Sequence, residues 1–220
     1  MIIYAGYGEI GIQGLQSIYS DFEFSTSDIV VLNDPNSDDF LFKNYCKKYK
    51  LKAINENEIN QNTGLDFEIC ISVHWRKKIK KNLINLCKKG GINLHPSLLP
   101  KYAGCSSLAW AIINNEEYVG YTWHKITENF DEGDILLQAP IKVDELDTSF
   151  SLWNRVNKEG IIRIVDVIKM VIKDECMPIK QDLKKRTYFP RGFPSFDEAL
   201  EVNKNLSRRR YERASFFPSK

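Results

Sequence analysis

Short apolar runs alternate with longer amphipathic segments along the first half of the chain, and this alternation constrains the fold more than any other feature. Runs rich in β-branched residues are typical of buried strands, whereas apolar residues at helical spacing are typical of helices that pack on a sheet. Regular strand–helix alternation favours a parallel sheet covered by helices. We therefore predict an α/β fold with a mostly parallel sheet flanked by helices.

The apolar runs predict five strands, at Ile2–Ala5, Ile29–Asn33, Leu51–Ile54, Phe67–Val73 and Ile92–His95. The amphipathic segments predict helices near Ile10–Ser20, Asp38–Lys48, Lys77–Lys89 and Ser106–Asn115. Ser37 is a candidate N-cap for the second of these helices, and the polar residues 55–62 are expected to form a loop.

The second half of the chain predicts a β-hairpin followed by one long helix. The hairpin strands are Tyr118–Ile126 and Asp134–Val143, and the helix is Thr148–Ile172, capped by Asp147 or Thr148. The composition changes at about Met177, where prolines become frequent and arginines and aromatics follow. We therefore expect a main domain over residues 1–176 and a C-terminal extension over residues 177–220 that packs on it.

Composition excludes several classes of protein. The chain of 220 residues is 43% hydrophobic, which is enough for one sizeable core, and its net charge is +2 from 31 basic and 29 acidic residues. So balanced a charge favours neither nucleic acid nor membrane as a partner. The five cysteines form no CxxC pair, and neither a secretory signal nor a bilayer-length apolar run is present. We expect a cytoplasmic protein.

The turn Gly6-Tyr7-Gly8-Glu9-Ile10-Gly11 matches the GxGxxG pattern between a predicted strand and a predicted helix. This is the context of a dinucleotide-binding fingerprint, and Asp34 follows the second strand, where a ribose-binding acid would lie. A tight strand-to-helix turn also needs small residues without any ligand. Taken alone, the motif leaves both interpretations open.

Asn93 and His95 lie two positions apart at the carboxyl end of a predicted central strand. Residues at this spacing point to the same face of a strand, and open α/β sheets bind ligands at that edge. Pro96 and Pro100 restrict the following loop, which favours a preorganised site over a simple surface connection. Asp131 lies in a turn after the next strand and is a candidate third partner. An amide donor, a base and a carboxylate are the parts that acyl transfer needs.

Other reactive residues have simpler explanations. Cys105-Ser106-Ser107 lacks the GxSxG elbow, so we interpret a serine as a helix N-cap and the cysteine as a packing residue. No metal is expected, because no compact ligand motif is formed by the histidines at positions 74, 95 and 124. The triplet Arg208-Arg209-Arg210 is interpreted as a solvated helix face. Residues 213–217 remain open between an aromatic anchor in the core and a site for phosphate and base.

Three motifs in combination resemble the 10-formyltetrahydrofolate-dependent formyltransferases. They are Asn-x-His-Pro-Ser-Leu-Leu-Pro from Asn93, Gly-x-Thr-x-His from Gly120, and Phe-Asp-x-Gly from Phe130. The resemblance covers roughly residues 67–140. It implies a Rossmann-like fold whose glycine turn binds no dinucleotide, and it implies a catalytic triad of Asn93, His95 and Asp131.

The same resemblance implies 10-formyltetrahydrofolate as the co-substrate. The residues expected to contact the folate are Val73, His74, Trp75, Arg76, Lys125, Thr127 and Phe130. The residues expected to contact the acceptor are Tyr102, Gly104, His124, Arg213 and Phe216. Many members carry an arginine before the glycine that follows Leu-Leu-Pro, whereas this chain has Ala103-Gly104, so one acceptor contact is expected to be missing.

The branch of the family is inferred from three features. The residues after Val143 leave no room for the additional domain of methionyl-tRNA formyltransferases, and Glu9 would repel the phosphate of glycinamide ribonucleotide. The ending Arg213-Ala214-Ser215-Phe216-Phe217-Pro218 resembles the Arg-Ala-x-x-Phe-Pro ending of sugar N-formyltransferases. This implies formylation of a nucleotide-linked amino sugar, such as a dTDP-4-amino-4,6-dideoxyhexose, for lipopolysaccharide O-antigen synthesis, by a homodimer. The alternatives are a glycinamide ribonucleotide formyltransferase and a non-catalytic Rossmann nucleotide-binding module.

Overall fold

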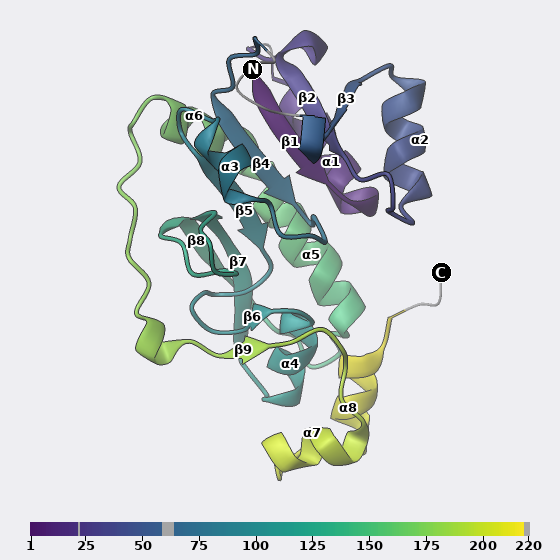
Figure 1. Cartoon of the computed structure of the whole chain (residues 1–220). Coiled ribbons are helices and arrows are strands. Elements are labelled where there is room, and N and C mark those ends of the chain that lie inside the picture. The colour runs from purple at the N-terminus through teal and green to yellow at the C-terminus, as the bar shows by residue number, and fades with distance from the viewer. Residues whose placement is uncertain (22, 59–63, 218–220) are drawn as a thin grey trace.

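A mixed sheet forms the centre of the computed structural model, which describes residues 1–21, 23–58 and 64–217 (Figure 1). Within these residues the sheet has seven strands in the order β3-β2-β1-β4-β5-β7-β8. Their bounds are Ile2–Gly6 (β1), Ile29–Asn33 (β2), Lys52–Asn55 (β3), Ile69–Val73 (β4), Gly91–His95 (β5), Tyr118–Lys125 (β7) and Ile135–Lys142 (β8). β1 to β5 pair in parallel, and β7 and β8 add an antiparallel hairpin. The predicted α/β fold is confirmed.

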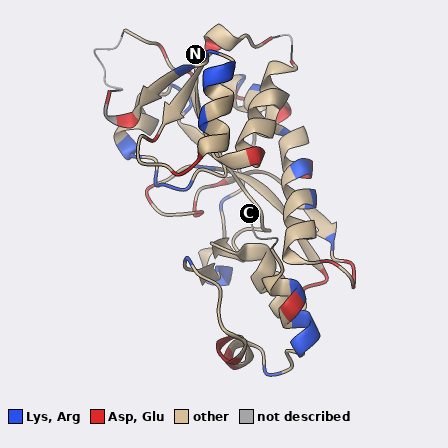
Figure 2. Cartoon of the chain, turned by 90° about the vertical axis from the view of Figure 1, so that its right-hand side faces the viewer, with Lys and Arg blue, Asp and Glu red and all other residues tan. Residues whose placement is uncertain are grey.

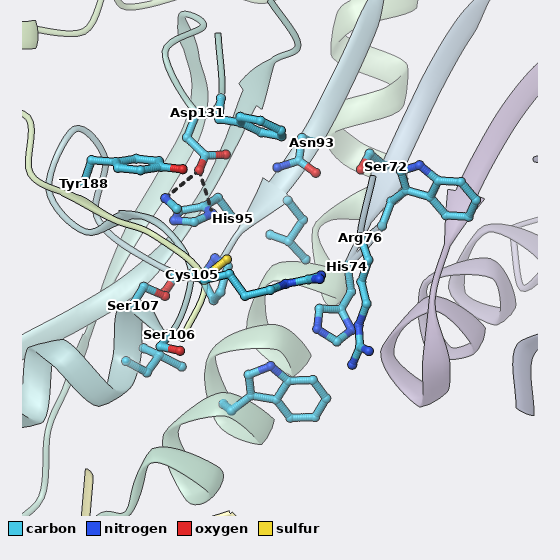
Figure 3. A pocket seen from close by; sticks show the side chains of 18 of the residues that line it. Ser72, His74, Arg76, Asn93, His95, Cys105, Ser106, Ser107, Asp131 and Tyr188 are labelled. Carbon is cyan, nitrogen blue, oxygen red and sulfur yellow. Dashed lines mark hydrogen bonds and ion pairs between the residues drawn. The ribbon is translucent and has the colours of Figure 1, made fainter. Parts of the chain in front are cut away.

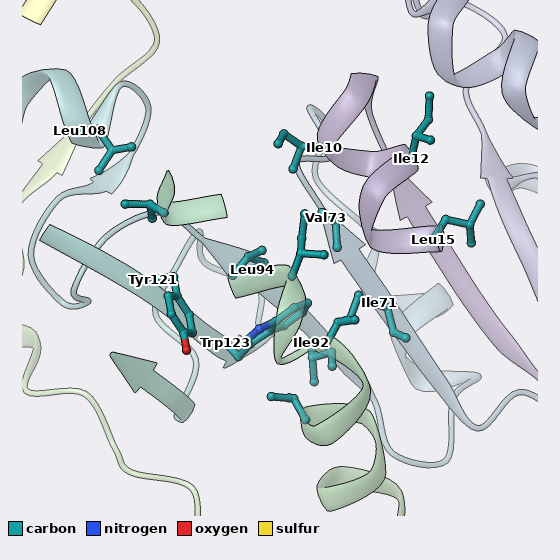
Figure 4. Close-up of a cluster of buried hydrophobic side chains, with 14 of the residues drawn as sticks. Ile10, Ile12, Leu15, Ile71, Val73, Ile92, Leu94, Leu108, Tyr121 and Trp123 are labelled. Carbon is teal, nitrogen blue, oxygen red and sulfur yellow. The ribbon is translucent and has the colours of Figure 1, made fainter. Parts of the chain in front are cut away.

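One face of the sheet carries the larger hydrophobic core. The helices that pack there are α1 (Gly8–Tyr19), α2 (Phe40–Lys48), α5 (Ser149–Ile162) and α6 (Ile164–Ile172). Along each strand alternate residues enter this core, because side chains alternate between the two faces. Figure 4 shows how side chains from α1, β4, β5 and β7 meet in this layer, among them Leu15, Val73, Leu94 and Trp123.

The other face is covered only in part. A smaller cluster forms around Ile3, Val30 and Cys70 under the short helix α3 (Lys81–Asn85). The prediction of a helix over 77–89 is therefore wrong. Lys77 pairs with Asp34 at 2.6 Å and the Lys80 N–H donates to Glu56 at 2.8 Å, contacts that hold the residues before Lys81 in an extended path. Residues 74–79 consequently line a cavity.

Two further helix predictions need correction. The long helix predicted over 148–172 is two helices, α5 and α6, because Arg163 (φ −91°, ψ 0°) ends the first and begins the second. Its predicted cap is confirmed, since the Thr148 side chain accepts the Ser151 N–H at 3.1 Å. Asp39, not Ser37, caps α2 by accepting the Phe42 N–H at 3.0 Å.

Short elements complete the chain. The 3-10 helices are η1 (Thr26–Asp28), η2 (Glu56–Glu58) and η4 (Leu183–Lys185). Of the loop expected at 55–62, residue 55 ends β3, residues 56–58 form η2, and residues 59–62 lie outside the described residues.

The residues after Met177 are more structured than the sequence indicates. They form β9 (Tyr188–Phe189), α7 (Phe196–Val202) and α8 (Arg208–Ser215), and α8 packs against α4 (Ser107–Ile113). β9 pairs in parallel with β6 (Ala103–Gly104), a two-stranded sheet that the sequence did not predict. Buried residues of α7 and α8 join the larger core, so this extension packs on the main sheet domain.

Lys and Arg side chains and Asp and Glu side chains are both distributed over the molecule, as Figure 2 shows, which agrees with the net charge of +2. Arg208 and Arg209 are exposed on α8, as expected for a solvated helix face, although Arg208 also lies 4.0 Å above the Phe196 ring. None of the helices in the described part of the chain combines the length and the apolar character that crossing a bilayer requires.

Candidate active site

Three polar side chains lie side by side across the partly covered face of the sheet. Ser72 of β4 is opposite Asn93 of β5, which in turn is opposite His124 of β7. Directly opposite residues on neighbouring strands point to the same face. The intervening apolar residues, such as Leu94 and Trp123, enter the core under α5 instead. His95 lies two residues after Asn93 and shares its face, as the strand period predicts.

Asp131 reaches this group from the loop between β7 and β8. Its Oδ2 atom is 3.6 Å from His95 Nδ1, and its Oδ1 atom is 3.5 Å from His124 Nε2. The backbone N–H of Gly104 also donates to Oδ2 at 2.8 Å. Figure 3 shows the carboxylate above His95 with Asn93 beside them. The tertiary structure thus joins the three residues that the sequence proposed as a triad, with His124 as a fourth member.

Backbone carbonyls determine where each imidazole carries its proton. His95 Nε2 is 2.9 Å from the Tyr102 carbonyl, and His124 Nδ1 is 2.9 Å from the Lys125 carbonyl. A carbonyl oxygen can only accept, so both of these ring nitrogens carry hydrogen. In the neutral rings, the lone pairs therefore lie on His95 Nδ1 and His124 Nε2, both facing Asp131.

The amide of Asn93 is oriented by its hydrogen bond to His124. Its Nδ2 atom lies 3.1 Å from His124 Nε2, and the lone pair there makes Asn93 the donor. This contact uses one of the two N–H bonds of the amide. The other remains to donate to an oxygen atom in the cavity that Asn93 lines.

The environment keeps Asp131 ionised. Its side chain is only 11% exposed, and burial alone would raise the pKa of the carboxyl. When the two imidazoles are protonated, the charge of His95 and the hydrogen bond from His124, together with the Gly104 N–H, outweigh burial and hold the pKa of Asp131 well below its usual range. The site therefore presents a carboxylate beside His95 Nδ1, where an imidazolium would form.

This depressed pKa predicts a pH-dependent stability difference. A carboxyl whose pKa is lower in the folded state stabilises the fold above its unfolded pKa of about 3.9, and this contribution is lost as the pH falls towards the folded pKa. We expect Asp131→Asn to lower the free energy of unfolding most above about pH 5, with the difference from wild type shrinking below about pH 4. Denaturant unfolding of both proteins at a series of pH values through this interval measures the difference in the free energy of unfolding. A difference that does not change with pH would contradict the prediction.

A cavity of about 960 Å³ opens in front of these groups. One part of its wall is formed by residues 74–79 and 126–130, and another part by residues 104–109, 188, 191–193, 214, 215 and 217 together with α5. Pockets for a single small molecule are usually about 300–1,000 Å³. The volume lies at the upper end of this range, and Asn93, His95 and Asp131 are all part of the wall.

The structure brings some of the predicted binding residues to this cavity and leaves others away from it. Of the residues predicted for the folate, its wall includes His74, Trp75, Arg76, Thr127 and Phe130. Val73 is fully buried in β4, and Lys125 is exposed outside the lining. Of the residues predicted for the acceptor, only Gly104 and His124 are part of the wall.

The remaining predicted acceptor residues have other contacts. The Tyr102 hydroxyl donates to Glu116 at 2.7 Å, and the carbonyl of Tyr102 holds His95. The Arg213 guanidinium donates to the carbonyls of Glu145 and Asp147. Phe216 is exposed outside the cavity lining, and its carbonyl accepts the Ser149 hydroxyl at 2.8 Å.

Several lining residues escaped sequence reasoning. They come from α5 and the C-terminal extension, namely Trp153, Asn157, Tyr188, Arg191 and Phe193, whereas Phe217 belongs to residues 213–217, which the sequence left open as a site for phosphate and base. The alternation of aromatic and basic residues near the C-terminus could have indicated the aromatic and basic residues among them. No local sequence pattern predicts that α5 lies beside the cavity. Phe217 lies edge-on to Trp153, with ring centroids 5.8 Å apart.

Of two predictions about the segment before α4, one is wrong and one is confirmed in position only. Cys105 is exposed on the cavity wall and is not a packing residue. Ser106 is the N-cap residue of α4, but its side chain makes no cap hydrogen bond, because its hydroxyl donates to the Gly192 carbonyl at 3.4 Å, while the Ser107 hydroxyl donates to the Pro96 carbonyl at 2.9 Å. Both serines instead tie the cavity wall to neighbouring loops.

The glycine-rich turn faces carboxylates. The Gly8 N–H at the start of α1 donates to Asp39 Oδ2 at 2.6 Å, and the Tyr7 hydroxyl donates to Asp38 at 2.7 Å. A phosphate at this helix terminus would meet a like charge. A Cβ atom on Gly11 would lie 2.8 Å from the Gly6 backbone, so close helix–strand packing explains that glycine. These contacts favour the structural interpretation of the turn.

No group of three or more His, Cys, Asp or Glu residues suited to a metal ion occurs in the described ranges. An ionised carboxylate beside two imidazoles, an oriented amide and an α/β scaffold together define a site suited to acyl-group transfer.

Comparison with known proteins identifies the family to which this chain belongs. A family model described as formyl transferase matches residues 30–168. The chain belongs to the formyl transferase family.

Relatives within the family include sugar N-formyltransferases. The chain is 38% identical over 173 residues to the GDP-perosamine N-formyltransferase of Brucella melitensis, a match covering 78% of this chain and 66% of that protein, or about two thirds of its length. The crystal structure of WlaRD, a sugar 3N-formyl transferase, in the presence of dTDP and 5-N-formyl-THF superposes with a TM-score of 0.74 at 26% identity, over 98% of this chain and 79% of WlaRD. An N-formyltransferase from Helicobacter canadensis shares the fold, with a TM-score of 0.77 at 22% identity, over 98% of this chain and 80% of that one.

Proposed function

We propose that this chain transfers a formyl group from 10-formyltetrahydrofolate to the amine of a nucleotide-linked amino sugar. The observation that carries the proposal is the arrangement of His95 Nδ1, which lies 3.6 Å from Asp131 Oδ2, and the amide of Asn93 in the wall of one cavity of about 960 Å³. The GDP-perosamine named for the Brucella relative and the dTDP and formyl folate present with WlaRD support this pair of substrates.

The reaction begins when the neutral amine attacks the formyl carbon on N10 of the folate. A new C–N bond forms, and the formyl oxygen gains negative charge in the tetrahedral intermediate. The free N–H of Asn93 donates to that oxygen, which is the role of a side-chain oxyanion donor. Collapse of the intermediate breaks the bond to N10 and releases the formylated sugar and tetrahydrofolate.

The proton moves from the amine to the leaving nitrogen. His95 Nδ1 accepts it as the amine attacks, directly or through a water molecule, and Asp131 stabilises the imidazolium. The same proton then passes to N10 as the bond to the formyl carbon breaks. No step requires a nucleophilic serine or cysteine.

The two parts of the cavity wall suggest a division of the substrates. We assign the folate to the side formed by His74, Trp75, Arg76, Thr127 and Phe130, and the nucleotide-linked sugar to the side lined by α5 and the C-terminal extension. Aromatic rings such as Trp153 and Phe217 suit a nucleobase, which stacks on aromatic faces. Homodimer formation, a cytoplasmic location and a role in O-antigen synthesis belong to the same proposal.

A mass-spectrometric assay tests the acceptor. The purified protein is given 10-formyltetrahydrofolate with a dTDP-linked 4-amino-4,6-dideoxyhexose, with GDP-perosamine, with a UDP-linked amino sugar, or with glycinamide ribonucleotide. We expect a gain of one formyl group on at least one nucleotide sugar and none on glycinamide ribonucleotide, because carboxylates surround the Gly8 turn. Formylation of glycinamide ribonucleotide alone would overturn the proposal in favour of purine synthesis.

A thermal-shift experiment tests the donor independently. A ligand that binds only the folded protein stabilises it, so saturating 5-formyltetrahydrofolate should raise Tm. NAD should leave Tm unchanged, because the N-terminus of α1 is occupied by Asp39. The reverse pattern would favour a non-catalytic nucleotide-binding module.

A further inference from the structure

The segment between α6 and α7 runs along the outside of the β7–β8 hairpin to β9, as Figure 1 shows. It is attached first by Ile179, whose N–H and carbonyl both bond to Ile135 at 2.8 Å. From there it passes beside the turn that carries Asp131 and then pairs with β6. One stretch of chain therefore contacts both loops that build the active site.

Gln181 holds the Asp131 turn from behind. The residue is only 6% exposed, and its Nε2 atom donates to the carbonyls of Asp131 at 2.9 Å and Gly133 at 2.6 Å. A single amide group thus bridges both ends of the turn. Asp131 itself has a φ of +58°, a conformation that is strained for a residue with a side chain and that persists only where neighbours hold it.

The same segment also holds the loop on the other side of the carboxylate. Thr187 accepts the Tyr102 N–H on its hydroxyl at 2.8 Å and the Ala103 N–H on its carbonyl at 2.9 Å. The Tyr102 carbonyl in turn fixes the ring of His95, and the Gly104 N–H donates to Asp131. The segment 179–189 therefore sets the relative position of His95 and Asp131, because it holds the backbone of residues 102–104 and of the Asp131 turn by hydrogen bonds.

We propose that Gln181 is a positioning residue for formyl transfer, which keeps the Asp131 carboxylate in place beside His95 Nδ1. Gln181 does not line the cavity, so it acts through Asp131 and does not touch either substrate. The proposal rests on the proposed function, because it takes His95 and Asp131 as the groups that move the proton.

The test compares Gln181→Met with Gln138→Met. Gln138 is a matched control, since its Nε2 atom also donates twice, to the Leu99 carbonyl at 2.9 Å and to the Thr122 hydroxyl at 2.8 Å, away from the Asp131 turn. We expect Gln181→Met to lower kcat by about 10- to 100-fold with both KM values within about threefold of wild type, because small misplacements of reacting groups are costly. Gln138→Met should keep kcat within about threefold, at a similar loss of Tm.

Hydrogen exchange supplies a readout that needs no acceptor. In the free protein, amides of the 130–134 turn should exchange faster in Gln181→Met than in wild type and should be unchanged in Gln138→Met. Unchanged kcat in Gln181→Met overturns the proposal. If the wild-type protein formylates no acceptor, the proposed function fails by itself, and unchanged exchange in Gln181→Met then overturns the positioning role. Gln181→Glu, which keeps the shape and removes both donors, replaces Gln181→Met if that variant does not fold.

Discussion

Replacing His95 with glutamine should lower kcat for formyl transfer by about 100- to 10,000-fold, the usual effect of losing a general base. The glutamine amide can still donate to the Tyr102 carbonyl, so the loop keeps its support, but it has no basic nitrogen to face Asp131. The amine proton then has no acceptor as the C–N bond forms. Steady-state formylation of the best acceptor, followed by mass spectrometry, measures the loss.

Folate binding separates a chemical defect from a folding defect in this variant. His95 is only 5% exposed, so His95→Gln should keep most of the Tm increase that 5-formyltetrahydrofolate produces in wild type. Loss of kcat with binding retained is the expected pattern. A kcat within about threefold of wild type would remove His95 from the role of base.

Replacing Asn93 with alanine should lower kcat by about 100- to 1,000-fold, which is typical for the removal of one oxyanion donor. The amide is held by His124 so that its second N–H faces the cavity, and alanine supplies no donor there. Because the charge on the formyl oxygen develops only as the intermediate forms, KM should change much less than kcat.

Asn203→Ala is the matched control for this variant. Asn203 is also half-buried and donates to a backbone carbonyl, that of Ile113 at 2.7 Å, but it lies in the C-terminal extension outside the cavity wall. Asn203→Ala should lose stability while keeping kcat within about threefold. Equal losses of kcat in the two variants would contradict the role of Asn93 as an oxyanion donor.

Elements governed by local sequence agree with prediction. The apolar run Ile29–Asn33 forms β2 over the same residues, and β1 and β5 differ from their predicted bounds by one residue. A buried strand needs a short run of β-branched apolar side chains, and this property is visible without knowing the neighbours. The β-hairpin of β7 and β8 is confirmed for the same reason.

Elements that depend on distant contacts differ from prediction. The helical spacing over 77–89 is real, but Asp34 and Glu56 from other parts of the chain hold the first residues of that segment extended. β6 and β9 have two residues each and exist only because segments far apart in sequence meet. No pattern within either segment predicts a partner so far along the chain.

In the candidate site too, some features follow from the sequence, whereas others depend on contacts between distant segments. The strand period places Asn93 and His95 on one face, and the family resemblance indicates Asp131. Which nitrogen of each imidazole carries the proton depends on the carbonyls of Tyr102 and Lys125, which the sequence analysis did not consider. Gln181 gave no signal, because a lone glutamine in a loop acquires its role only from the turn that folds against it.

By itself, the sequence determined the α/β architecture and placed Asn93 and His95 on one strand face, because apolar periodicity and residue spacing are local properties of the chain. The resemblance of its three combined motifs to known formyltransferases indicated the family. Only the tertiary structure decided which nitrogen of His95 faces Asp131, which residues complete the cavity wall and how the C-terminal extension supports the site. These features are hydrogen bonds and ion pairs between distant segments. Their geometry exists only once the sheet, the hairpin and the extension have packed together.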